Sequence, residues 1–283
     1  MRRGGLTMKK LQWNKITLTI LMAAIGIFML LPFAWMLSTS LKKPIDVFTY
    51  PIEWIPSDPQ FGNYSAVWLN KYYPFWLFFF NSFKVAFLTI GGTLIVSATA
   101  AYAFAKINFR GRNVIFLMFL STMMIPNHVT LVPRFILFHW IGIYNTHMAL
   151  ILPGVFSVIG IFLLRQFFAS VSNELSEAAQ IDGAGHTRIF FGIVVPLAAP
   201  AFVSLIILSF VSNWNSYIDP LIFLTGRNLY TVPLGIQALL DSEGMQFNLV
   251  MAAAACAILP VMTVFLVMQR YFIQGISAGG VKG

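Results

Sequence analysis

The stretch RQFFASVSNELSEAAQIDGAGHTRIFFGIVVPLAAP, from Arg165 to Pro200, is a polar segment between two long apolar stretches. The stretch before it, Ile141–Leu164, has no Asp, Glu, Lys or Arg, and the stretch after it, Ala201–Leu224, has Asp219 alone of these four types. Each is long enough to cross a bilayer core, which is about 30 Å thick and takes about 20 apolar residues in a helix. The sequence therefore predicts a water-exposed loop between two transmembrane helices.

The composition of the whole chain agrees with this interpretation. Of its 283 residues, 58% are hydrophobic and only 10% are charged. An average soluble domain carries roughly 25% charged residues, so this chain could not cover its surface with water-compatible groups. The composition excludes a water-soluble enzyme and indicates an integral membrane protein. Its single cysteine, Cys256, excludes an internal disulfide and a zinc site built from cysteines.

Working outward from the polar segment, the apolar stretches predict an all-α membrane protein with six transmembrane helices. The six predicted spans are Ile16–Leu37, Val85–Ala105, Val114–Pro126, Ile141–Leu164, Ala201–Leu224 and Leu249–Met268. The third is short, and we expect an amphipathic interfacial piece to follow it as far as Trp140. Arg134 in that piece is expected to extend towards the lipid headgroups.

The distribution of charge predicts the orientation. With the N-terminus in the cytoplasm, the inside segments hold twelve of the 18 Lys and Arg residues and three of the nine acidic ones. The positive-inside rule then places both termini in the cytoplasm. The net charge of +9 reflects topology and contact with anionic lipid, so the sequence predicts no nucleic acid partner. The predicted organisation is a cytoplasmic tail over 1–15, a permease domain over 16–273 that includes the loop 165–200, and a cytoplasmic tail over 274–283.

Few residues suggest chemistry inside the membrane. A polar group near the outer end of the fifth span has two interpretations: Asp219 is an interfacial carboxylate beside Pro220, or the group lines a pore. The possible pore-lining residues are Asn213, Asn215, Ser216, Tyr217 and Asp219. No pair of histidines has metal-ligand spacing, and the phosphate-binding pattern G-x-x-x-x-G-K-[ST] is absent. The sequence therefore predicts no catalytic residues, no metal and no cofactor, and no ATP binding through a phosphate loop.

The polar segment itself predicts two short helices separated by a break. Asn173 is expected to cap the first helix, with Glu174 and Glu177 in its first turns. Gly183 is expected to make the break, because glycine adopts positive φ at little cost. The second helix is expected to begin near Thr187 and to end at Pro196 and Pro200. Such a pair of helices suits docking into another protein, and a plain solvated loop is the alternative.

The order of residues in this segment resembles the EAA loop of bacterial ABC importer permeases. The pattern of that loop is E-A-A, three residues, G, nine residues, then I-x-L-P. The matching residues here are Glu177, Ala178, Ala179, Gly183, Ile193 and Pro196, with Val195 where leucine is usual. Most of the chain is also similar to binding-protein-dependent sugar permeases of the maltose-permease type, second subunit. The similar motifs are Asn81-Ser82-Phe83, Ala101 to Ala105, Met124-Ile125-Pro126, Ile161 to Phe167, Trp214-Asn215, Pro220-Leu221 and Gln269 to Gly275.

The resemblance implies a type I importer permease fold and a set of partners. In this family a solute-binding protein outside delivers a sugar to a pair of permease subunits, and a dimer of ATPase subunits drives them. The resemblance implies that Glu177, Ala178, Ala179, Asp182, Gly183, Ile193 and Pro196 couple the permease to the ATPase. The outside loop Thr225 to Asn248 would face the binding protein, and the tail from Gln274 would reach between the ATPase subunits. The expected location is the bacterial plasma membrane.

Three alternatives differ from this prediction. The first is an ABC importer permease for another solute, such as a glycerol phosphodiester. The second is an ion-coupled secondary carrier, which the scarcity of intramembrane charges disfavours. The third is a membrane-embedded enzyme, for which the sequence offers no convergent set of catalytic residues.

Overall fold

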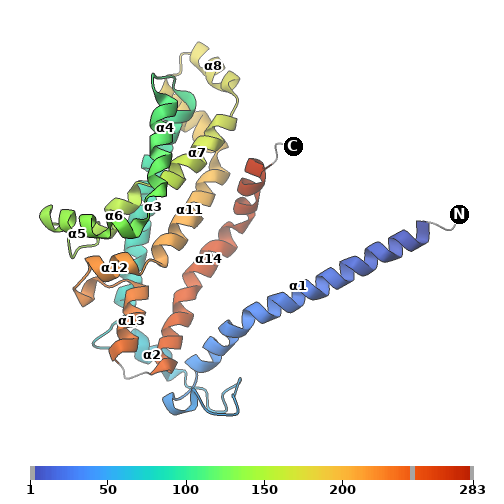
Figure 1. Ribbon diagram of the computed structural model, residues 1–283, viewed down its shortest axis with the longest axis vertical. Coiled ribbons are helices and arrows are strands. Elements are labelled where there is room, and N and C mark those ends of the chain that lie inside the picture. Colours follow the sequence, from blue (N-terminus) through green and yellow to red (C-terminus); the bar gives the residue numbers. More distant parts are fainter. Residues whose placement is uncertain (1–3, 243–245, 281–283) are drawn as a thin grey trace. The chain divides into compact units, whose positions relative to one another are not determined.

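The computed structural model describes residues 4–242 and 246–280, and the side chains of residues 15–241 and 246–270. In this part of the chain all regular secondary structure is helical (Figure 1). The chain divides into two compact units. Unit 1 comprises 1–70 with 240–256, and unit 2 comprises 71–239 with 257–283.

The predicted spans correspond to continuous helices in four cases and to bent helix pairs in two. Among the described residues, four helical stretches are long and apolar enough to cross a membrane by themselves: Lys15–Ser40, Phe75–Lys106, Met148–Ser170 and Phe247–Arg270. Two further candidates are the bent pairs Arg112–Met124 with Asn127–Trp140, at 89°, and His186–Leu197 with Ala199–Trp214, at 75°. The described residues thus provide four spans, or up to six if each bent pair is one span.

Unit 1 contains the first long helix and the loop that follows it. Helix α1 (Gly4–Ser40) includes most of the predicted N-terminal tail, and is followed by η1 (Pro44–Asp46) and α2 (Gly62–Trp68). The Asn63 amide fastens α2 to the end of α1, donating to the carbonyls of Ser40 and Lys42 at 2.8 and 2.9 Å. The first turns of α14 (Phe247–Gly280) join this unit, where Asn248 Nδ2 donates to Asn63 Oδ1 at 3.2 Å.

Unit 2 is organised around helix α3 (Phe75–Lys106). Helices α6 (Met148–Val155), α7 (Val158–Ser170) and α11 (Ala199–Trp214) pack directly against α3 (Figure 1). Two glycines let these helices approach closely: a Cβ on Gly154 would lie 2.5 Å from Thr89, and a Cβ on Gly160 would lie 2.6 Å from Ser97 Oγ. In lipid no hydrophobic effect drives helices together, so their association depends on van der Waals contact, and small residues allow the close approach that this contact needs.

Two predicted spans are interrupted in the structure. The stretch Ile141–Leu164 has no helix before Met148, and it breaks between α6 and α7, where the Ser157 hydroxyl accepts a hydrogen bond from Gly160 N at 3.0 Å. The stretch Ala201–Leu224 ends its main helix at Trp214 and resumes as α12 (Ile218–Phe223). Serine caps and proline favour such boundaries, which an apolarity pattern does not reveal. Neither stretch is one uninterrupted α-helix, although Met148–Ser170 as a whole is still long and apolar enough to be a candidate span.

The remaining elements of unit 2 connect these helices. They are α4 (Arg112–Ser121), η2 (Thr122–Met124), η3 (Asn127–Thr130), α5 (Leu131–Trp140), α8 (Asn173–Ile181), α9 (His186–Ile189), the π-helix η4 (Phe190–Val194), α10 (Val195–Leu197), η5 (Arg227–Leu229) and most of α13 (Val232–Ser242). The predicted C-terminal tail from Gln274 continues α14 as far as Gly280, and its last three positions lie outside the described residues.

Candidate functional site

The polar segment 165–200 forms two short helical stretches beyond the end of α7, as its sequence predicts (Figure 1). Helix α8 begins at Asn173, but its cap is Ser172, whose hydroxyl accepts a hydrogen bond from Glu174 N at 3.2 Å. The prediction that Asn173 caps this helix was wrong by one residue. The reason lies in a tertiary contact, because the Asn173 side chain bonds elsewhere.

Lys106, the last residue of α3, holds the beginning of α8 in place. Its Nζ donates to the Val171 carbonyl at 2.6 Å and to Asn173 Oδ1 at 2.8 Å. The sequence indicated Lys106 only as one of the inside positive charges. Its ammonium instead joins the central helix of unit 2 to α8 through charge-assisted hydrogen bonds.

Gly183 ends α8 in a Schellman motif. Its φ is +80°, its N–H donates to the Gln180 carbonyl at 3.0 Å, and Ala184 N donates to the Ala179 carbonyl at 2.8 Å. These are the two hydrogen bonds that define the motif, which requires a left-handed residue after the helix. A Cβ on Gly183 would meet no atom within 4 Å, so the backbone conformation rather than crowding within this chain selects glycine. The predicted break at this residue is present.

The outer face of α8 is exposed and partly apolar. Glu177, Ala178, Asp182 and Gly183 are exposed, whereas Ala179 is half-buried. The sequence analysis overlooked two apolar side chains on this helix, Leu175 at 48% exposed and Ile181 at 87%. Each lies three residues from Ala178, so each neighbours Ala178 on the helix surface, a signal that helical spacing could have given.

The second helical stretch attaches the segment to the core of unit 2. It consists of α9, the π-helix and α10 rather than the single helix expected from Thr187 to Pro196. Ile189, Phe190 and Val194 are buried against residues of α3, α7 and α11, Ile193 is half-buried, and Pro196 is exposed. Tyr102 of α3 adds a polar contact, its hydroxyl lying 3.3 Å from both His186 Nδ1 and the His186 carbonyl. The exposed helix α8 is therefore connected to a stretch that is packed into the core of unit 2.

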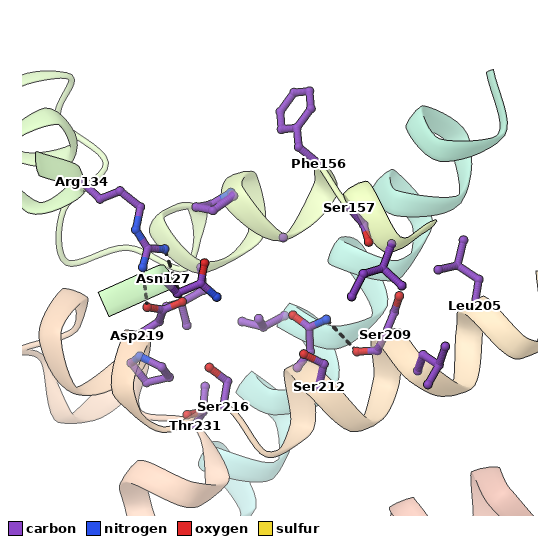
Figure 2. A pocket seen from close by; sticks show the side chains of 18 residues that line it. Asn127, Arg134, Phe156, Ser157, Leu205, Ser209, Ser212, Ser216, Asp219 and Thr231 are labelled. Atoms are coloured by element: carbon purple, nitrogen blue, oxygen red, sulfur yellow. Dashed lines mark hydrogen bonds and ion pairs between the residues drawn. The ribbon is translucent and has the colours of Figure 1, made fainter. Parts of the chain in front are cut away.

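A cavity of about 340 Å³ lies where the two interrupted helices break (Figure 2). Its walls come from α3, α5, α6, α7, α11 and α12 and from the segments Asn127 and Thr231. The polar lining residues are Asn127, Arg134, Ser157, Ser209, Ser212, Asn213, Ser216, Asp219 and Thr231. The cavity at the helix breaks is therefore lined by polar as well as apolar side chains.

Arg134 and Asp219 face each other in the wall of this cavity (Figure 2). Arg134 Nη2 lies 3.1 Å from Asp219 Oδ1, and Nη1 lies 3.5 Å from Oδ2. The arginine side chain is 19% exposed and that of the aspartate 38%. The sequence led us to expect Arg134 to extend towards the lipid headgroups, and did not reveal that its guanidinium pairs with a carboxylate from α12.

The five residues predicted as possible pore-lining residues do not all lie together. Asn213, Ser216 and Asp219 line the cavity, whereas Asn215 and Tyr217 are not among its lining residues. Asn213 Nδ2 donates to the Ser209 carbonyl at 2.7 Å. Among the described residues no three His, Cys, Asp or Glu side chains are grouped so that they could hold a metal ion.

The chain belongs to the family of binding-protein-dependent transport system inner membrane components, whose pattern matches residues 93–278. It is thus a multi-pass membrane component of an ABC transporter, a permease subunit and not an enzyme, and it works with a solute-binding protein. This confirms the family resemblance seen in the segment 165–200. It also decides against a secondary carrier and a membrane-embedded enzyme.

Two relatives illustrate the similarity in sequence. The chain is 34% identical over 272 residues to the arabinooligosaccharides transport system permease protein AraQ of Bacillus subtilis, covering 95% of this chain and 96% of AraQ. It is 36% identical over 237 residues to the sn-glycerol-3-phosphate transport system permease protein UgpE of Pectobacterium atrosepticum, covering 82% and 84% of the two chains.

A solved structure supports the fold. The chain superposes with a TM-score of 0.81 on a chain of a bacterial ABC transporter involved in the import of the acidic polysaccharide alginate, covering 92% of this chain and 97% of that one. The sequence identity is 24%, so this likeness concerns the fold alone. The all-helical ABC permease fold predicted from the sequence is therefore confirmed.

Proposed function

We propose that this chain is one of two permease subunits that import a sugar or oligosaccharide through the bacterial plasma membrane. An extracytoplasmic binding protein delivers the solute, and a dimer of separate ATPase subunits supplies the energy. The observation that carries the proposal is the exposed helix α8, which ends at Gly183 and bears the E-A-A pattern on a chain of this family.

In this proposal α8 docks in a groove of the ATPase subunit. Glu177 makes a polar contact there, Ala178 and Ala179 permit close approach, and Asp182 and Gly183 form the turn that fits the groove. Leu175 and Ile181 add apolar area, since both are exposed although they belong to a polar segment. Ile193 and Pro196 belong to the stretch that follows α8 and α9, and this stretch attaches α8 to the core of unit 2.

The proposed topology has six spans with both termini in the cytoplasm. The third span then lies in the bent pair of 112–124 and 127–140, and the fifth begins with Ala199–Trp214. The first member of the second bent pair, His186–Leu197, belongs to the segment 165–200, which lies on the same side as the ATPase subunits. The domain organisation follows, with a permease domain over 16–273 between two cytoplasmic tails. The outside loop Thr225 to Asn248, which includes η5 and α13, faces the binding protein.

The solute is proposed to be a sugar because AraQ, the relative matched over most of both chains, is named for arabinooligosaccharides. UgpE, at a similar identity, is named for sn-glycerol-3-phosphate, and this observation favours a polar non-sugar solute as the second candidate. The cavity between the broken helices suits either class in its polarity. In both cases the cavity forms part of the translocation path.

Uptake by the complete reconstituted complex tests the function. Proteoliposomes that contain this chain with its second permease and ATPase subunits are expected to accumulate a sugar only when ATP is inside and the binding protein is outside. The isolated chain is expected to bind no ATP. Saturable ATP binding by the isolated chain, or sugar accumulation without the ATPase, would contradict the proposal.

A further inference from the structure

The charges in the cavity wall indicate which class of solute the path accepts. Of the eighteen described residues that line the cavity, Arg134 and Asp219 are the two with ionisable acidic or basic side chains. The names of the relatives leave the charge of the solute open. AraQ is named for arabinooligosaccharides, which carry no charge, whereas UgpE is named for a phosphate ester, which is an anion.

The two charges cancel each other at close range. Each oxygen of the Asp219 carboxylate faces one terminal nitrogen of the Arg134 guanidinium, at 3.1 and 3.5 Å. The guanidinium also lies over the ring of Phe223, 5.5 Å from its centre. Because both side chains are held from different elements, α5 and α12, the pair is fixed by the fold and the wall of the cavity has no net charge.

The rest of the polar wall consists of hydroxyl and amide groups. Four serines and two asparagines line it, together with Thr231, which is 4% exposed. The Thr231 hydroxyl and Arg134 Nε are buried and have no hydrogen-bond partner among the described residues. The hydrogen-bonding groups that a ligand could reach include the side chains of Asn127 and Ser212, which line the cavity and are exposed, and a ligand rich in hydroxyl groups would suit them.

Apolar side chains complete the wall. Val85, Leu150, Pro153, Leu205 and Leu208 lie among the polar residues that line the cavity. A sugar unit presents hydroxyl groups around its edge and C–H groups on its faces, so it matches a wall of alternating hydroxyl, amide and apolar surface. A small anion offers no apolar face to this part of the wall.

We propose that this cavity selects neutral sugars and rejects anionic ones, because Asp219 neutralises Arg134. The inference rests on the proposed function, in which the cavity is part of a solute path. An anionic solute would have to displace Asp219 from Arg134 and leave that carboxylate unpaired beside it. The negative charges of the solute and of Asp219 would then lie close together, and this repulsion disfavours binding of an anionic solute.

Net charge can be varied independently of the rest of the wall. Asp219→Asn leaves the cavity with one positive charge, Arg134→Gln leaves one negative charge, and the double variant restores neutrality without the ion pair. Asp58→Asn is the matched control, since Asp58 pairs with Lys43 at 2.7 Å on an exposed part of unit 1. All variants are compared as reconstituted complexes with the same binding protein, whose own selectivity then cancels between variants tested with the same probe. Uptake is divided by the amount of assembled complex.

The probes are a neutral arabinooligosaccharide and an oligogalacturonide of the same length. We expect the wild type to import the neutral probe without inhibition by the anionic one. Each single variant should import the neutral probe about tenfold more slowly, because one charge of a partly buried pair is left unpaired. The double variant should remain within about twofold of the wild type, as the two effects are coupled. Only Asp219→Asn should be inhibited by the oligogalacturonide, and Asp58→Asn should match the wild type.

Two results would overturn the inference while leaving the proposed function intact. One is import of the oligogalacturonide by the wild type as fast as the neutral probe. The other is uptake of the neutral probe by the double variant that is as slow as uptake by either single variant. That result would mean that the ion pair stabilises the structure and that neutralising Arg134 is not its role. A complex that hydrolyses ATP with its binding protein yet imports neither probe would instead contradict the sugar assignment, and the inference with it.

Discussion

Lys106 Nζ lies 2.8 Å from Asn173 Oδ1, so the last residue of the central helix α3 is bonded to the first residue of α8. The same ammonium also donates a hydrogen bond to the Val171 carbonyl, just before α8, at 2.6 Å. A helix that docks on an ATPase has to pass its movement to the membrane helices. We propose that this pair of hydrogen bonds passes the movement of α8 to α3.

Removing this connection is expected to weaken coupling rather than folding. In Lys106→Met, α8 loses its bonds to α3, at a cost of about 1 kcal/mol for each net hydrogen bond. We expect ATP hydrolysis to continue while sugar uptake per ATP hydrolysed falls several-fold. Arg110→Met is the control, because it removes an inside positive charge from the neighbouring exposed loop. Equal uptake per ATP in the two variants would argue against a connecting role for Lys106.

Two neighbouring glycines separate backbone strain from the effect of added bulk. Gly183 has φ of +80°, whereas Gly185 has φ of −75°, and neither would have an atom of this chain within 4 Å of an added Cβ. Gly183→Ala should therefore cost roughly 1–2 kcal/mol through its left-handed conformation, whereas Gly185→Ala should be nearly neutral. The measurement is the affinity of each permease complex for the ATPase subunit. A Gly185→Ala variant that binds as weakly as Gly183→Ala would contradict this account.

The exposed apolar side chain on α8 is expected to matter more than the charge beside it. Glu177→Ala removes a partly exposed ionic contact, which typically contributes about 0.2–1 kcal/mol. Ile181→Ser removes an apolar side chain that is 87% exposed in this chain, and burial of such a side chain contributes roughly 1.5–3 kcal/mol. Co-purification of the ATPase should therefore fall further for Ile181→Ser. The opposite order would indicate a docking surface dominated by charge.

The proposed topology predicts the location of the C-terminus. A reporter that is active only outside the cytoplasm, fused after Gly283, should be inactive. The same reporter placed in the loop between α12 and α13 should be active. Activity of the first fusion would mean that the number of spans is odd. The assignment of the bent pair that contains α4 and α5 as one span would then be the first to change.

The sequence was sufficient to predict features that depend on local chemistry. The apolar stretches predict the long helices, and the glycine at 183 predicts the break after α8, because its positive φ is a local requirement. The spacing from Glu177 to Pro196 predicts the family without any knowledge of packing. These features rely on neighbouring residues, so a single sequence contains the information.

Features that depend on distant contacts were missed. Arg134 and Asp219 are 85 residues apart, and either side chain alone suits a membrane interface, so their pairing could not be read from the sequence. The same applies to Lys106 and Asn173, since the contact of Asn173 with Lys106 leaves the capping of α8 to Ser172. The breaks in two apolar stretches were also missed, because uniform apolarity hides where a helix ends.

The central claim, that α8 couples this permease to an ATPase, is tested most directly by uptake of Gly183→Glu complexes at normal membrane abundance. The substitution combines a left-handed backbone with a bulky side chain at the docking surface, and leaves the membrane helices untouched. The account predicts normal insertion, loss of ATPase co-purification and no sugar uptake. Full uptake by Gly183→Glu at wild-type abundance would show that α8 is not the coupling element.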